Sequence, residues 1–454
     1  MSHFNIIMLT MSLFFMLFVF FLVYYKWNKL DLVDLSVVVV CLYFPVYATI
    51  DLLIHNYPSY DVISAILSIS LPMIAVILPW VTLNFILPKF KIDILSNLKI
   101  SNITNIAKTT KSSVVVVLFS AIVLLEVYLL VKYGLSYFYD KSYFISLGAH
   151  PSKWFINLII FFTTFVLIGT VFFAAKAHNT TGWKKVLLYG CIFVLFLIAM
   201  IHGRRQLFNS MLIVFLIINH DRKLFSWPTI AYGLIFLILF IFMFNFYQAT
   251  REIFIYKVGK ESLSSIFIHN GRRKFFSANP TLQNLHTRPA MWKLNYLIIK
   301  NQIYGTSKYM LPGEIGYRSM FNCVPRLFWP HKKMYDPVQA VCFKEGLPAD
   351  DYNWNLFAFA QSDFGFASPV LMGFLATFAF MLLSGILKLT ESAPSFFVVI
   401  VGFVTYYLFW VNQAYEAIFY LARNLIIIFL FCFIFYIIRS VYKILIEFKY
   451  NKIV

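Results

Sequence analysis

Arginines that could hold phosphate groups stand where strongly apolar segments of this chain begin. Arg204 and Arg205 precede one apolar run, and Arg423 opens another. A guanidinium group keeps its charge at every physiological pH, and its planar fork can bind two phosphate oxygens at once. Several such side chains gathered in one place would suit a pyrophosphate ligand.

Other ionisable side chains fall at the same level of the apolar segments. They are Asp51, Glu126, His202 and Glu416. Ionisable groups within a membrane are costly and usually face the interior of a helix bundle or a water-filled cavity. We therefore predict a cavity that opens toward the outer side. A carboxylate that simply reaches the lipid headgroups is the simpler interpretation, which is favoured for Asp51 and kept open for Glu126.

One long hydrophilic stretch, 248–369, could form a water-facing surface. It contains 15 basic and 8 acidic residues, a net charge of +7. Such a surface suits an anionic ligand, although basic residues that merely solubilise a loop would give the same composition. We predict that this stretch contains the functional site of the protein.

A helix is predicted inside this stretch, just after Arg288. Pro289 is typical of a first helical turn, and Leu294 and Ile298 follow at helical spacing. His286 and Arg288 then lie at the entrance of the helix, where backbone N–H groups and the helix dipole favour anions. An ordinary helix start explains the same residues without an anion.

Composition places the whole chain in a membrane. Of its 454 residues 61% are hydrophobic, and the mean hydropathy is +0.78, which excludes a soluble globular core. The formal charge of +19 lies mostly between apolar segments, as in proteins oriented in a bilayer. We therefore expect the lipid bilayer, and no nucleic acid, as a partner. The first apolar run lacks a signal-peptide cleavage site.

The predicted fold class is an all-α polytopic membrane protein with one large extracytoplasmic loop. The predicted domains are 1–247, 248–368 and 369–454. Short loops on one side carry 17 basic residues and those on the other carry 6, which places the amino terminus and the long loop outside. The eleven predicted spans are 5–25, 35–55, 62–88, 114–134, 155–176, 186–203, 206–219, 227–247, 369–387, 396–415 and 419–438.

Cysteines and missing motifs limit the chemistry further. Cys323 and Cys342 both lie in the long loop, where either a disulfide or two thiols is compatible with the sequence. No Walker A loop and no His/Cys metal spacing is present. We expect neither a cofactor nor a metal.

The order of the motifs resembles the Wzy-type polymerases of bacterial surface polysaccharides. The resemblance rests on the run from His202 to Arg205, the large outer loop, the run from Pro325 to Lys332, the run from Ser362 to Phe366, and the last outer turn with Glu416 and Arg423. It covers the chain from about residue 186 onward. It implies a metal-independent GT-C-like glycosyltransferase in the bacterial cytoplasmic membrane, with its active site toward the periplasm.

The resemblance also implies a reaction and roles. The growing glycan would move from undecaprenyl pyrophosphate onto an incoming lipid-linked oligosaccharide repeat unit. Arg205, Arg423 and Arg288, with Arg204 and Arg326, would bind the pyrophosphate. Glu416, Asp363 or His286 would be the general base. A chain-length regulator and a flippase would be partners.

Two alternatives remain. An O-antigen ligase-like glycosyltransferase would use the same donor and similar arginines. A flippase or transporter of lipid-linked oligosaccharide should place polar groups along the whole membrane path and show two related halves, whereas here the ionisable groups gather on one side.

Overall fold

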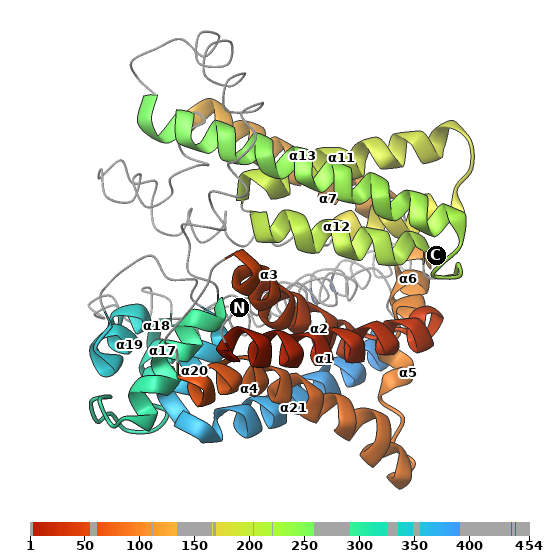
Figure 1. Ribbon diagram of the computed structural model, residues 1–454. Helices are drawn as coiled ribbons and strands as arrows, with labels where there is room; N and C mark the ends of the chain where they lie inside the picture. Colours follow the sequence, from red (N-terminus) through yellow and green to blue (C-terminus); the bar gives the residue numbers. More distant parts are fainter. Residues whose placement is uncertain are drawn as a thin grey trace.

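The computed structural model describes residues 3–54, 61–109, 112–133, 166, 169–202, 204–219, 221–257, 291–322, 324, 335–347, 355–390, 437 and 441. The regular elements over these ranges are helices, and the one β-bridge described joins Asp31 to Lys99. The protein is therefore an all-α membrane protein over the described part (Figure 1).

The amino-terminal part of the chain supplies three helices of the first bundle. α1 (His3–Lys26) and α2 (Leu32–Cys41) form a hairpin, and one π-turn at Leu42–Val46, around Pro45, leads into α3 (Tyr47–Ile54). α2 begins with a capping box, because Asp31 accepts hydrogen bonds from the N–H groups of Val33 and Asp34 while the Asp34 side chain accepts from the Asp31 N–H.

α4 and α21 complete this bundle by packing along each other. α4 (Val62–Val81) starts at its N-cap Asp61, and α21 (Ser368–Thr390) runs beside it. The approach is close at Gly373, where a built Cβ atom would lie only 2.5 Å from Leu78 Cδ2.

A second group of helices packs beside the first bundle and shares its hydrophobic core. The group contains α7 (Ser112–Tyr133), α11 (Trp183–His202), α12 (Arg204–Asn219) and α13 (Trp227–Lys257). α13 has 31 residues, which corresponds to roughly 46 Å at 1.5 Å per residue and exceeds the thickness of a bilayer core. The predicted domain boundary at 247 and 248 therefore falls inside one continuous helix.

Among the described residues, four helical segments are long and apolar enough to cross a membrane. They are Phe4–Lys29, Leu32–Leu53, Val62–Phe90 and Leu356–Gly385. The first three match predicted spans, and the fourth begins thirteen residues before the predicted start at 369. The count of eleven stays a prediction, because several of the predicted segments lie outside the described residues.

The remaining elements of the described part are short. They cap the two ends of the first bundle: η1 (Trp27–Lys29), η3 (Thr82–Ile86), η4 (Leu87–Phe90), α5 (Leu95–Leu98), α6 (Ile100–Thr109), α17 (Met291–Ile303), α18 (Glu314–Asn322), α19 (Pro337–Glu345), α20 (Leu356–Phe364) and η6 (Gly365–Ala367).

The end of the bundle that holds Lys26 is basic and carries exposed aromatic rings. Tyr25, Trp183 and Trp227 are each more than 70% exposed and adjoin basic residues of the short loops. Tyrosine and tryptophan beside lysine are typical of a membrane–water interface. At this end Trp27 Nε1–H donates to the Arg222 carbonyl at 2.7 Å, which joins the two groups of helices.

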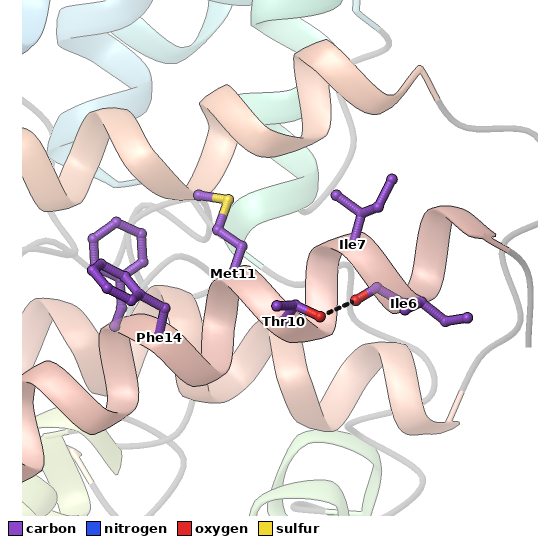
Figure 2. Close-up of a pocket in the computed structure, with 6 residues that line it drawn as sticks. Ile6, Ile7, Thr10, Met11 and Phe14 are labelled. Atoms are coloured by element: carbon purple, nitrogen blue, oxygen red, sulfur yellow. Dashed lines mark hydrogen bonds between the residues drawn. The ribbon is translucent and has the colours of Figure 1, made fainter.

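An apolar hollow lies along the other half of α1 (Figure 2). It is lined by Ile6, Ile7, Met11 and Phe14, with Thr10 between them. The Thr10 hydroxyl donates to the Ile6 carbonyl at 2.8 Å within the helix, so its hydrogen bond is used locally. The hollow thus offers a hydrocarbon surface.

Candidate functional site at the amino-terminal end of the bundle

Helices α17 to α20 gather at the end of the bundle where α1 begins (Figure 1). Trp292 and Tyr296 of α17 are fully buried against Phe4, Met8 and neighbouring apolar residues of α3 and α4. The long stretch that the sequence presents as a water-facing loop is therefore partly a helical cap with its own core, anchored in the bundle.

Asp51 forms the polar part of this anchor. The Trp292 Nε1–H donates to Asp51 Oδ2 at 3.0 Å, and Lys293 Nζ lies 3.7 Å from Asp51 Oδ1. Only 4% of Asp51 is exposed. The expectation that Asp51 reaches the lipid headgroups is wrong, because its carboxylate is enclosed by α17. Burial lowers the pKa of Lys293, and the nearby Asp51 carboxylate opposes that shift.

A second polar contact fixes α17 at the start of α4. Tyr296 Oη accepts a hydrogen bond from the Asp61 N–H at 3.2 Å. The Asp61 carboxylate caps α4 by accepting from the Ser64 N–H at 2.9 Å, and its hydrogen bond with the Ser64 side chain lowers the pKa of Asp61. α17 is thus held through two residues that are one helical turn apart.

Asp363 caps α18. Its Oδ1 accepts from the Ile315 N–H at 3.1 Å, and its Oδ2 accepts from the Gly316 N–H at 2.9 Å. Only 2% of Asp363 is exposed. Both oxygens of this predicted base therefore satisfy backbone donors that the first turn of a helix leaves unpaired.

The residues around Asp363 turn α20 into α21. Gly365 has a φ of 58° and a ψ of −141°, a conformation that glycine adopts and other residues avoid. The Phe364 ring lies against Gly313, 3.3 Å from where a Cβ atom would stand. The run from Ser362 to Gly365 therefore shapes a helix corner.

Buried polar groups join the helices of the cap. Glu345 is 1% exposed, and its oxygens accept from Ser362 Oγ at 2.7 Å and from Ser307 Oγ at 2.5 Å. Lys344 donates to the Ser362 carbonyl. Sequence reasoning missed this network, although charged residues within the otherwise apolar face of α19 were its signal.

A second buried cluster, also missed, lies at the opposite end of the bundle. Lys26 Nζ donates to Asp34 Oδ1 at 2.8 Å and to Asn84 Oδ1 at 2.7 Å, and Trp80 Nε1–H donates to Asp34 Oδ1 at 2.8 Å. Burial and the Asp34 carboxylate raise the pKa of Asp31 to about 7, against the lowering effect of Lys26. The cluster ties the hairpin of α1 and α2 to α4.

The remaining predicted site residues can be placed only in part. The backbone of Arg204 and Arg205 forms the first turn of α12, while their side chains lie outside the described part. Cys342 is buried in α19, and Cys323, the other cysteine of the long loop, lies outside the described residues. Four charged residues and one histidine of the predicted site also lie outside the described residues: Arg288, Arg326, Arg423, Glu416 and His286.

α12 runs with its start directed toward the side of the cap. Phe215, near its other end, packs against Trp27 with ring centroids 6.1 Å apart, which places that end beside the carboxyl end of α1. α12 has 16 residues, roughly 24 Å, and α1 has 24 residues, roughly 36 Å, so α12 begins short of the level where α1 begins. Figure 1 shows α12 above the helices of the first bundle.

No family model, no curated protein and no solved structure matches this chain. Within the described ranges, no group of three or more His, Cys, Asp or Glu side chains is placed to hold a metal ion. The candidate site consists of the cap with its anchor at Asp51, and the start of α12, which holds Arg204 and Arg205, is directed toward its side of the bundle.

Proposed function

We propose that this protein polymerises lipid-linked oligosaccharide repeat units of a bacterial surface polysaccharide. The observation that carries the proposal is that Arg204 and Arg205 open α12 at its end farther from Trp27, so that the helix amino terminus is directed toward the side of the cap. Two arginines at a helix amino terminus combine fixed charge with unpaired backbone N–H groups, which suits a pyrophosphate.

The reaction follows from this ligand. A hydroxyl group of the incoming repeat unit attacks the anomeric carbon of the growing glycan. The new C–O bond forms as the bond to undecaprenyl pyrophosphate breaks, and pyrophosphate leaves with the electron pair. Arginines that neutralise this developing charge stabilise the transition state and need no metal. Arg205 and Arg423, with Arg204, Arg288 and Arg326, are the proposed pyrophosphate ligands.

A general base accepts the proton of the attacking hydroxyl group. The candidates are Glu416, His286 and Asp363. Because both oxygens of Asp363 accept backbone N–H groups of α18, the geometry favours Glu416 or His286.

The apolar hollow on α1 supports a lipid-linked substrate. It lies on the half of α1 that begins beside the cap, and its lining is hydrocarbon (Figure 2). A polyprenyl chain beside α1 could therefore leave its pyrophosphate near the cap. We place the protein in the cytoplasmic membrane with this end toward the periplasm, next to a flippase and a chain-length regulator.

The test is a glycan ladder on a gel. The host lacking this protein is complemented with wild type, Arg205→Ala, Arg205→Lys or the control Lys223→Ala, which alters an exposed cation at the opposite end of the bundle. We expect a ladder with wild type and Lys223→Ala, single-repeat glycan with Arg205→Ala, and partial recovery at most with Arg205→Lys, since lysine lacks the planar fork.

Other outcomes would reject polymerisation. Long chains that persist in both Arg205→Ala and Arg423→Ala would remove the proposed pyrophosphate site. Long chains that remain unattached in the deletion strain would indicate a ligase. Lipid-linked repeats trapped on the inner leaflet would indicate a flippase.

A further inference from the structure

The segment after α17 is held rigidly at several points. Gln302 and Gln361 exchange hydrogen bonds of 2.8 Å each, the first through the Gln361 carbonyl and the second through the Gln302 side chain. The Lys308 N–H donates to the Lys344 carbonyl at 2.7 Å, and the Leu311 N–H donates to Glu314 Oε2 at 3.1 Å. These hydrogen bonds hold Ile303, the last residue of α17, and the loop 304–312 that follows it, and we call 303–312 the fixed loop.

This fixed loop presents large apolar side chains outward. Ile303, Tyr304, Tyr309 and Leu311 are 41%, 60%, 84% and 59% exposed. We call these four side chains the loop edge. Apolar side chains held out from a rigid backbone mark a surface for a partner or a membrane, because leaving them in water forgoes the free energy of burial.

The loop edge continues into the apolar outer surface of α21. Gly313 contacts Phe364 at the corner between α20 and α21, and Gln302 bonds to α20, so both ends of the loop are attached to this corner. Phe366, Val370 and Phe374 beyond the corner are 50%, 49% and 63% exposed on a segment apolar enough to cross a membrane. Figure 1 shows the loop beside the start of α21.

The charge of the loop agrees with a lipid surface. Residues 303–312 contain Lys308 and no acidic residue. Lys308 Nζ lies 3.9 Å from the centroid of the Phe343 ring, which is itself 62% exposed. Tyrosine, aromatic rings and lysine are the residues that favour the boundary between acyl chains and phosphate headgroups.

We propose that the loop edge lies in the headgroup region of the leaflet at this end of the bundle and binds phospholipid there. The tyrosines reach the acyl boundary, and Lys308 faces phosphate oxygens. A glycan would also stack on tyrosine, but Ile303 and Leu311 extend the surface with aliphatic groups that favour acyl chains. The proposal stands independently of the proposed function, because lipid contact does not require polymerase activity.

Spin labels in reconstituted vesicles test the proposal. Single cysteines at Tyr309 and Leu311 are labelled in a full-length chain whose five native cysteines are serine. Phe374→Cys is the control in lipid, and Gln339→Cys, exposed on α19, is the control in water. Collisions of each label with oxygen and with a water-soluble nickel complex are compared.

We expect the labels at Tyr309 and Leu311 to collide with oxygen in several-fold excess over the nickel complex relative to Gln339, approaching Phe374. Values equal to those of Gln339 would overturn the proposal. Labels that stay in water and lose mobility when polysaccharide is added would overturn it in favour of a glycan surface.

A second measurement uses the wild-type chain and guards against misfolding of the cysteine variants. A photoactivatable hydrophobic probe confined to the vesicle bilayer is activated, and labelled peptides are mapped by mass spectrometry. We expect residues 303–312 to be labelled and residues 335–347 to be unlabelled apart from Phe343. Absence of label from 303–312, with α21 labelled normally, would also reject lipid contact.

Discussion

The Trp292 indole donates its N–H to the Asp51 carboxylate at 3.0 Å, across 241 positions of the chain. Lys293, the next residue of α17, lies 3.7 Å from the other carboxylate oxygen. One buried acid therefore meets both a neutral donor and a cation of the same helix turn. This contact decides where the cap stands on the bundle.

Asp51→Ala should weaken the attachment of the cap. The substitution removes the acceptor of the Trp292 N–H and the carboxylate beside Lys293, in a largely buried place. We expect a loss of about 2–4 kcal/mol of stability. Thermal unfolding of the purified protein in detergent, followed by tryptophan fluorescence, measures the loss.

Asp51→Asn separates the hydrogen bond from the ion pair at Asp51, and Asp221→Ala is the control at an exposed ion pair. Asp51→Asn keeps an acceptor for Trp292 and should lose less stability than Asp51→Ala. Asp221→Ala removes an exposed partner of His178 and should change stability by less than about 1 kcal/mol. Equal losses in Asp51→Ala and Asp221→Ala would show that the buried contact contributes little.

The sequence predicts the helices far better than it predicts this contact. Apolar runs such as 5–25 and 62–88 predict helices because the bilayer requires every backbone group to be satisfied within the segment. Leu294 and Ile298 likewise predict α17. The pairing of Asp51 with Trp292 depends on two segments that are distant in the chain, and no local periodicity encodes it.

Two charged residues of the long stretch, Lys344 and Glu345, do not face water. The net positive charge of the stretch suggests a water-facing loop, yet Lys344 and Glu345 are buried in the cap and bond to Ser362 and Ser307. Buried charges become stable only when such partners are present. The composition gives the number of charged residues, but it does not show which residues bind them in the folded protein.

Gly373→Ala should disturb the packing of α21 against α4. The new Cβ atom would stand 2.5 Å from Leu78 Cδ2 and 3.1 Å from Leu78 Cβ, so rotation of the leucine side chain cannot relieve the whole clash. We expect a loss of about 1–3 kcal/mol, typical of overpacking. Thermal unfolding in detergent measures it.

Gly385→Ala is the matched control on the same helix. Nothing lies within 4 Å of a Cβ atom built at Gly385. The Gly385→Ala variant should be as stable as the wild type, or more stable by up to about 1 kcal/mol, because alanine lowers the backbone entropy of the unfolded chain. If Gly373→Ala is as stable as Gly385→Ala, the two helices do not approach as closely as described.

Asp31 should make stability fall as pH rises toward neutrality. Its pKa is raised from 3.8 to about 7 by burial and by the Asp34 carboxylate. Between pH 3.8 and about pH 7 the folded protein binds more protons than the unfolded chain. The free energy of unfolding is therefore highest near the acidic end of this pH range and decreases as the pH rises through it. Unfolding temperatures at about pH 5 and about pH 8 measure this dependence.

Asp31→Asn should flatten this pH dependence. Asparagine still offers an oxygen to the N–H groups of Val33 and Asp34, but it carries no titrating group. Asp93→Asn, which alters an exposed aspartate at the same end of the bundle, should keep the wild-type dependence. An unchanged dependence in Asp31→Asn would assign the titration to another group.

Variants of Asp363 test whether this aspartate, at the corner between α20 and α21, has a structural or a catalytic role. Asp363→Asn retains one acceptor oxygen for the two N–H groups of Ile315 and Gly316, and Asp363→Ala retains none. If Asp363 caps α18, stability should fall in the order wild type, Asn, Ala, with about 1–3 kcal/mol lost in the alanine variant. Glycan synthesis should follow the same order and recover on cooling.

A catalytic base at Asp363 would give a different pattern. Asp363→Asn would then be nearly as stable as wild type and yet inactive at every temperature, because the amide cannot accept the proton of the attacking hydroxyl group. Measuring the unfolding temperature and the glycan ladder of the same variant separates the two roles. Since both carboxylate oxygens already bind backbone donors, we expect activity to follow stability, which leaves Glu416 and His286 to be tested as the base.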